Sequence, residues 1–230
     1  MKKFILFVII LAYHSLTFGL DNISFSFFSK KLFRGTKTSN SGRYYYSNGN
    51  IITRILKPKE LFILTNIVGE SEIYDPSTNS VTRSQKKITA AETNPLFYFF
   101  MRKTIDMGLK TNGFKMTDSR IEQELLISKW EMTQKTNNNN LHIEAELVLK
   151  DNNPIYLSYI VNGKIIEKTY YSNYHSISAN FRLPSVLTNI SYLEGDSIIT
   201  KTEYNDIRIN NNADKPYFDF KIPPHAKTQK

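Results

Sequence analysis

The side chains whose types could perform catalysis or bind a metal are few and scattered in this sequence. Cysteine is absent, which excludes disulfides, cysteine-zinc sites, iron–sulfur clusters and thiol catalysis. His142, His175 and His225 lie far apart, without the HExxH spacing of zinc proteases. The sequence contains no Gly-x-Ser-x-Gly, Walker or dinucleotide-binding glycine motif. We therefore predict that the protein is not an enzyme and holds no metal and no cofactor.

The composition describes a folded, basic chain rather than a disordered one. The 230 residues are 40% hydrophobic and 22% charged, which suffices for one domain with a sizeable core. Lysine and arginine number 30 and the acidic residues 21, so the formal net charge is +9. This charge permits a nucleic acid or an anionic membrane as partner without requiring either.

The first nineteen residues have the three parts of a secretory signal peptide. A basic start precedes the apolar run 4–13, which is too short to span a bilayer, and small residues at 17 and 19 fit a cleavage site. We predict cleavage near Gly19; an uncleaved anchor is disfavoured by the polar residues 14–15. Because this pattern predicts export of the mature chain, we expect no nucleic-acid partner.

The rest of the chain has the pattern of short β-strands separated by turns. The Asn-Gly pairs at 48–49 and 162–163 favour tight hairpins, so successive strands run antiparallel. Together these segments predict a large meandering antiparallel sheet. The predicted strands cover residues 24–33, 43–46, 51–56, 61–67, 72–74, 125–133, 141–150, 155–161, 164–170, 177–183, 186–192, 197–203 and 207–209.

One apolar segment has helical spacing instead. Asn94 fits an N-cap and Pro95 the first helical position, and apolar residues then recur at helical spacing as far as Met107, before Gly108. This helix is apolar over most of its surface and must therefore cover, or be covered by, another apolar element. Residues 86–92 form a second, shorter helix in this interpretation.

Two predicted strands are apolar on both faces, over residues 61–64 and 155–160. A sheet of that composition needs apolar cover on each side, and the predicted helices are too small to provide it. Two explanations stay open at this point. The first is a closed barrel that packs its own core, and the second is a cavity for an acyl chain or similar apolar ligand.

Short motifs at both ends of the chain resemble the LolA-type outer-membrane lipoprotein carrier family. The N-terminal motifs are the run 42–46, the strand 61–67, Gly69 and the strand end 73–76, which reads Ile-Tyr-Asp-Pro. The C-terminal motifs are 183–185, 207–210 and 218–226, the last reading Phe-Asp-Phe-Lys-Ile-Pro-Pro-His-Ala. The motifs come in the family's order, and the apolar helix follows the Tyr-Asp-Pro strand as it does in the family.

The resemblance implies an α+β, mostly β fold for a single LolA-like domain over residues 20–230. The expected fold is an incomplete antiparallel β-barrel, a large curved sheet of about eleven strands with a few helices covering its concave apolar face. Two features differ from the family. Residues 20–23 leave no room for the usual N-terminal helix, and the turn 47–50 lacks the arginine that helps to close the lid.

The resemblance also implies a function. Family members carry the acyl chains of lipoproteins through the periplasm, from an inner-membrane lipoprotein-releasing transporter toward an outer-membrane acceptor. We expect such a periplasmic carrier of acylated lipoproteins or related lipid; the alternative is a non-catalytic interaction or sensor module on the same scaffold. Candidate residues of the cavity wall and lid, each of which could equally be core, are Tyr44, Tyr46, Ile52, Leu61, Ile63, Phe97, Phe100 and Met101.

Overall fold

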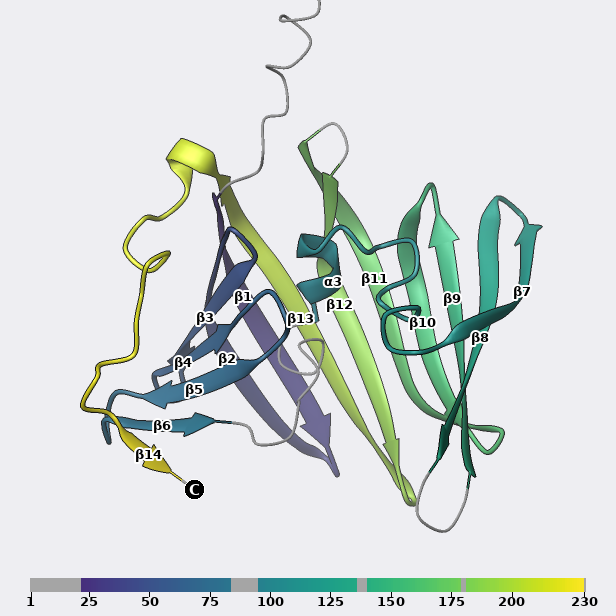
Figure 1. Cartoon of the computed structure of the whole chain (residues 1–230), viewed down its shortest axis with the longest axis horizontal. Helices are drawn as coiled ribbons and strands as arrows, with labels where there is room; N and C mark the ends of the chain where they lie inside the picture. The colour runs from purple at the N-terminus through teal and green to yellow at the C-terminus, as the bar shows by residue number, and fades with distance from the viewer. Residues whose placement is uncertain (1–21, 84–94, 136–139, 179–180, 230) are drawn as a thin grey trace, which may run out of the picture.

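The computed structural model describes residues 22–83, 95–135, 140–178 and 181–229. These residues form one open sheet of fourteen strands in the order β14-β6-β5-β4-β3-β2-β1-β13-β12-β11-β10-β9-β8-β7 (Figure 1). The signal peptide predicted for residues 1–19 and the helix predicted for 86–92 lie outside the described residues. The strands are β1 (Asn22–Phe33), β2 (Thr36–Ser47), β3 (Asn50–Lys57), β4 (Leu61–Thr65), β5 (Ser71–Asp75), β6 (Ser80–Arg83), β7 (Lys115–Glu122), β8 (Leu125–Lys135), β9 (Asn140–Lys150), β10 (Asn153–Val161), β11 (Lys164–Ser178), β12 (Phe181–Leu193), β13 (Asp196–Ile209) and β14 (Lys227–Gln229).

Tight turns make neighbouring strands antiparallel. Between β2 and β3, Asn48 and Gly49 have φ angles of 49° and 83°, as a two-residue hairpin of this twist requires. Asn162 and Gly163 turn β10 into β11 in the same way, with φ of 51° and 72°. The strand β1 then pairs with β13, and β14 runs parallel to β6. The predicted antiparallel meander is confirmed.

The sheet has more strands than the eleven or so predicted. Strands β6, β7 and β14 were not predicted; β7 is exposed along its whole length and therefore lacks the apolar alternation that marks a half-buried strand. Strands β11, β12 and β13 are also longer than predicted. Each pairs with a strand on both sides, and this pairing keeps segments of low strand propensity extended. An example is Pro184, which lies within β12 opposite Tyr174.

The predicted helix is much shorter than expected. The helix α3 covers only Phe97–Phe100, and its N-cap is Leu96, without a side-chain cap bond. The predicted N-cap, Asn94, lies outside the described residues. Arg102 follows the C-cap residue Met101 and adopts a left-handed conformation, with φ of 56°, and this ends the helix long before Gly108. The segment continues as turns as far as Gly113. We call residues 95–114, which include α3, the covering segment.

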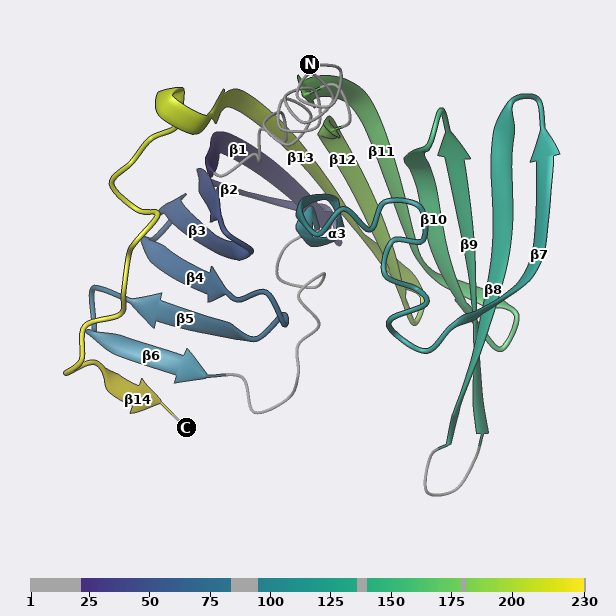
Figure 2. The same cartoon turned by 45° about the horizontal axis from the view of Figure 1, so that its top comes forward.

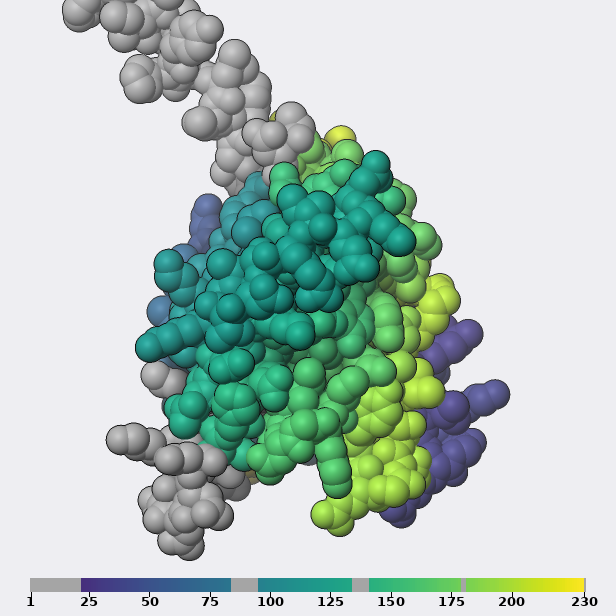
Figure 3. Space-filling model, turned by 90° about the vertical axis from the view of Figure 1, so that its right-hand side faces the viewer, coloured from purple at the N-terminus to yellow at the C-terminus, as the bar shows by residue number. Residues whose placement is uncertain are grey.

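The sheet curves around the covering segment. Figures 1 and 2 show α3 and the turns after it on the concave side, and the C-terminal chain on the outer side of β3 to β6. Strands β7 and β14 form the two free edges, so the barrel is incomplete, as predicted. Figure 3 views the sheet from the β7 edge, and its colours pass from teal through green and yellow to purple as the strands recede toward β1.

Two apolar clusters lie on opposite faces of this sheet. The inner cluster joins the concave face to the covering segment and includes Phe25, Tyr44 and Phe99. The outer cluster contains Tyr45 and Phe62 and packs against residues 217–226 of the C-terminal chain. Because side chains alternate along a strand, consecutive tyrosines of β2 belong to different clusters.

Candidate functional site

Five of the candidate wall and lid residues belong to or contact the inner cluster around α3. Tyr44, Phe97 and Phe100 are members of the cluster, and Tyr46 is partly buried against it. The rings of Tyr46 and Phe100 stack with centroids 4.6 Å apart and an interplanar angle of 12°. Met101, directly after the helix, is also partly buried against this cluster.

The remaining three candidates lie on β3 and β4. Ile63 pairs with Thr53 and Leu61 with Ile55, which packs against the inner cluster, so both candidates lie on the concave face and both are half-buried. Ile52 lies on the opposite face, in the outer cluster, where it is 5% exposed. The expectation that Ile52 faces the concave side is therefore wrong, because alternation along β3 directs Ile55 to the concave face and Ile52 to the opposite face.

Side chains fill the concave face where the candidates gather. Phe100 is 3% exposed, and its ring contacts those of Phe25, Tyr46 and Phe181. Phe25 in turn stacks on Tyr44 with centroids 4.9 Å apart. Packing of this density resembles an ordinary protein core. We call this part, formed by β1 to β3 and α3, the filled half of the concave face.

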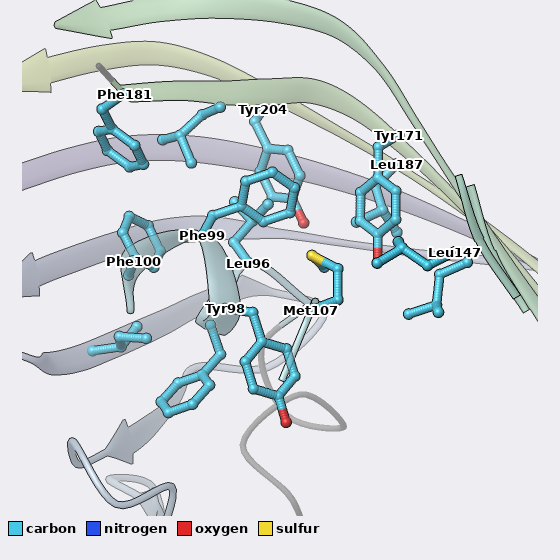
Figure 4. Close-up of a cluster of buried hydrophobic side chains, with 14 of the residues drawn as sticks. Leu96, Tyr98, Phe99, Phe100, Met107, Leu147, Tyr171, Phe181, Leu187 and Tyr204 are labelled. Atoms are coloured by element: carbon cyan, nitrogen blue, oxygen red, sulfur yellow. The ribbon is translucent and has the colours of Figure 1, made fainter. Parts of the chain in front are cut away.

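A large hollow lies on the other half of the concave face, between the covering segment and strands β8 to β13. Its volume is about 1130 Å³. Figure 4 shows its neighbourhood: Tyr171, Leu187 and Leu147 lie far from Phe100, with Met107 between. The residues that line the hollow come from the covering segment and from five strands, β8 and β10 to β13. They are Pro95, Tyr98, Met107, Asn112, Phe114, Met132, Thr133, Leu157, Tyr159, Glu167, Thr169, Tyr171, Leu187, Asn189, Ser191, Thr200 and Thr202.

One part of the lining is apolar and aromatic. Leu157, Tyr171 and Leu187 are at most 6% exposed and belong to the inner cluster. Burial raises the pKa of Tyr159 and of Tyr171 well above the ordinary value of a phenol, so both rings stay uncharged even in alkaline solution. This part of the hollow offers an uncharged surface of the kind that buries an acyl chain favourably.

The other part of the lining is a hydrogen-bonded polar row across β11 and β12. Asn189 Nδ2 donates to Glu167 Oε1 at 2.8 Å and to Thr169 Oγ1 at 3.0 Å. Ser191 Oγ donates to the Asn189 Oδ1 oxygen at 3.1 Å. The row thus fixes the orientation of the Glu167 carboxylate. The hollow is therefore amphipathic, with an apolar and a polar part.

Local contacts hold the covering segment over the hollow. Gly108 has a φ of +73°, and a Cβ at this position would come within 2.0 Å of the Tyr98 ring. Asn112 Nδ2 donates a hydrogen bond of 2.8 Å to the Tyr98 hydroxyl oxygen. Glycine at position 108 is thus required both by the backbone conformation and by the close approach of this ring.

None of the predicted wall residues lines this hollow, and sequence reasoning missed the residues that do. One sequence signal pointed to the hollow: the strand predicted over 155–160, which is apolar on both faces, contains the lining residues Leu157 and Tyr159. The polar members, such as Thr169 and Asn189, lie on the same face as buried apolar neighbours and interrupt the alternation by which a concave face is recognised. Their positions follow only from the observed strand register.

The described part of the chain carries neither a metal-binding cluster nor a membrane-spanning helix. No group of three or more His, Cys, Asp or Glu residues there could hold a metal ion. None of the helices in the described ranges is long and apolar enough to cross a bilayer.

Solved structures share this architecture, whereas no family model and no curated protein matches the chain. A LolA superfamily protein of Nitrosomonas europaea is similar with a TM-score of 0.56 and 13% identity, covering 84% of this chain and 88% of that one. A structure named as an outer membrane lipoprotein-sorting protein domain, from Vibrio parahaemolyticus, is similar with a TM-score of 0.59 and 10% identity, covering 92% of this chain and 95% of that one. A DUF1329 family protein of Desulfovibrio piger is similar with a TM-score of 0.57 and 10% identity, covering 92% of this chain and 93% of that one. The chain therefore has a LolA-like fold.

Proposed function

We propose that the protein binds the acyl chains of a lipid or an acylated lipoprotein in the hollow and carries them as a non-catalytic periplasmic carrier. The observation that carries this proposal is the hollow itself, whose apolar part is lined by Leu157, Tyr171 and Leu187 within a LolA-like sheet. Its volume of about 1130 Å³ exceeds the roughly 300–1,000 Å³ of ordinary small-molecule pockets. Each methylene buried there contributes about 0.8 kcal/mol to binding.

The proposal places the mature chain, a single domain over residues 20–230, in the periplasm after cleavage near Gly19. The sequence supports export through the basic, apolar and small-residue pattern of residues 1–19. An inner-membrane lipoprotein-releasing transporter would load the carrier, and an outer-membrane acceptor would unload it. The name of the Vibrio neighbour, an outer membrane lipoprotein-sorting protein domain, supports a role in lipoprotein sorting.

The binding site in this proposal differs from the one that the sequence suggested. The rings of Phe97 and Phe100 anchor the covering segment in the inner cluster, together with Tyr44 and Tyr46, and these four residues do not form the wall of the site. Tyr98, Met107 and Phe114 face the hollow from that segment. The covering segment thus has a structural side and a ligand-facing side.

Lipid extraction followed by mass spectrometry of the purified protein tests the proposal directly. A co-purifying lipid or lipopeptide is the expected result. A protein that is empty, retains a stable protein partner and binds no long-chain amphiphile under any condition would contradict the carrier and support the interaction module.

A matched pair of variants locates the binding. Thr200→Trp places an indole in the hollow, whereas Thr188→Trp places it on the outer face of the same sheet, where Thr188 pairs with Lys201. Both threonines are half-buried. We expect Thr200→Trp to weaken binding of a pyrene-labelled long-chain alcohol at least about fivefold, since it removes volume that the chain would occupy. Equal binding by both variants would contradict a ligand in the hollow.

A further inference from the structure

Glu167 is the charged side chain in the described lining of the hollow; the other described lining residues are uncharged. This is unexpected in a chain whose net charge is +9. The adjacent Lys168 does not balance it, because alternation along β11 directs Lys168 to the other face, where its Nζ lies 5.6 Å from the centre of the Tyr192 ring.

The carboxylate of Glu167 is held in place but lacks a counter-ion within the part of the chain that the structure describes. Among the side chains that the structure describes, which exclude those of residues 134, 135 and 140, no lysine, arginine or histidine nitrogen lies within 4.0 Å of it. Its Oε1 accepts the hydrogen bond from Asn189, which uses its remaining hydrogen-bonding groups on Thr169 and Ser191. This half-buried carboxylate is therefore available to a cation that enters the hollow.

The surroundings of this carboxylate suit a cation. Tyr159 pairs with Glu167 across β10 and β11, and both side chains line the hollow together with Tyr171. Aromatic faces attract ammonium groups, and a carboxylate provides the charge-assisted hydrogen bond that such a group seeks. The apolar side chains Leu157 and Leu187 lie in the same hollow, within reach of a chain attached to that group.

We propose that the hollow binds an amphiphile whose head group carries a protonated amine, with Glu167 as its counter-ion and the acyl chain against Leu157 and Leu187. This inference rests on the proposed function, because it names the head group of the lipid that the hollow holds. The amine could belong to a phosphoethanolamine lipid or to the free N-terminus of a diacylated lipopeptide. The shared chemistry is a primary ammonium attached to acyl chains.

Competition binding with a matched pair of ligands tests this inference. Dodecylamine and dodecanol share one chain and differ only in the head group, and each displaces the pyrene-labelled alcohol. We expect dodecylamine to bind wild-type protein at least about tenfold more tightly, which is the difference that one charge-assisted hydrogen bond supplies. In Glu167→Gln this preference falls to less than about threefold, while dodecanol binding is unchanged.

Glu146→Gln serves as the control variant. Glu146 is half-buried on the outer face of β9 and pairs with Ser158 and Lys129, so the same change of charge occurs away from the hollow. This variant keeps the full preference for the amine. Equal loss of the preference in both variants would show a general charge effect and overturn the inference.

The source of the amine is identified by acetylation. Lyso-phosphatidylethanolamine and a diacylated lipopeptide are each compared with their N-acetylated forms on wild-type protein. Weaker binding on acetylation of one of them identifies that source, and weaker binding of both shows that the hollow recognises the amine alone. If acetylation changes neither, the inference is wrong although acyl binding stands. If no long-chain ligand binds at all, the proposed function itself fails.

Discussion

The two halves of the concave face differ in the size of the side chains that face inward. In the filled half, Phe25, Phe27 and Tyr44 point toward α3 and meet the ring of Phe100 or one another. In the half that carries the hollow, the inward positions of β11 to β13 hold small or polar residues such as Thr169, Asn189 and Thr200. One curved sheet thus forms a solid core where inward rings meet one another, and a cavity where rings such as Tyr159 and Tyr171 stand beside short side chains such as Thr169.

The covering segment connects the two halves. Phe97 and Phe100 anchor its first turn in the inner cluster, whereas Tyr98 and Met107 line the hollow. Because the filled half anchors the covering segment, the segment stays over the hollow, where side chains leave space unfilled. The comparison therefore predicts that substitutions in the filled half affect stability more than binding, and that those in the hollow do the reverse.

The largest effect is expected from Phe100→Ala. Deleting this buried ring leaves a void beside Tyr46 and Phe181, and should lower the free energy of unfolding by about 3–5 kcal/mol. Met132→Ala, at the edge of the hollow, should cost less than about 2 kcal/mol, because Met132 already lacks packed neighbours on one side. Chemical denaturation measures both; equal losses would show that the two halves are packed alike.

A smaller effect is expected from Gly108→Ala. The new methyl group meets the Tyr98 ring in a left-handed backbone conformation, so we expect a loss of about 1–3 kcal/mol and weaker binding of the pyrene-labelled alcohol. Gly35→Ala is the control, because Gly35 has nearly the same φ, +75°, with no atom within 4 Å of the added Cβ.

The difference between the two glycine variants isolates the contact with Tyr98 from the backbone strain. Identical losses of stability together with identical binding would mean that Gly108 does not position the covering segment.

The smallest expected change is a gain in stability from Tyr204→Phe, on β13, where the ring packs against Phe25 and Tyr44 of the filled half. The Tyr204 hydroxyl is buried, and it has no hydrogen-bond partner among the residues that the structure describes. Removing it eliminates an unsatisfied polar group, so the free energy of unfolding should rise by about 1 kcal/mol. Thermal unfolding at neutral pH checks this, and a fall of 1 kcal/mol or more would mean that the hydroxyl has a partner.

Much of the fold was predictable from local chemistry. The Asn-Gly hairpins at 48–49 and 162–163 gave the antiparallel meander, and the motif order of the chain indicated the LolA-like, incomplete barrel. The edge strand β7 was not predictable, because every one of its residues is exposed. The end of α3 was missed because Arg102, rather than a glycine, adopts the left-handed conformation there.

The site was less predictable than the fold. Apolar character alone marks both Phe100, which is packed core, and Leu157, which lines the hollow. Whether an inward side chain meets another or faces empty space depends on the register of distant strands and on the path of the covering segment. Ile52 illustrates this, because it lies in the outer cluster whereas the adjacent Ile51 lies in the inner cluster.

Photolabelling tests the central claim most directly. A long-chain alcohol that carries a diazirine in its chain is bound, irradiated, and mapped by tandem mass spectrometry of the digested protein. We predict labels on peptides that contain Met132, Tyr159 or Leu187, and their loss in the presence of excess dodecanol. Labels confined to the outer cluster or to the surroundings of Phe100, or labels that excess dodecanol does not reduce, would contradict binding in the hollow.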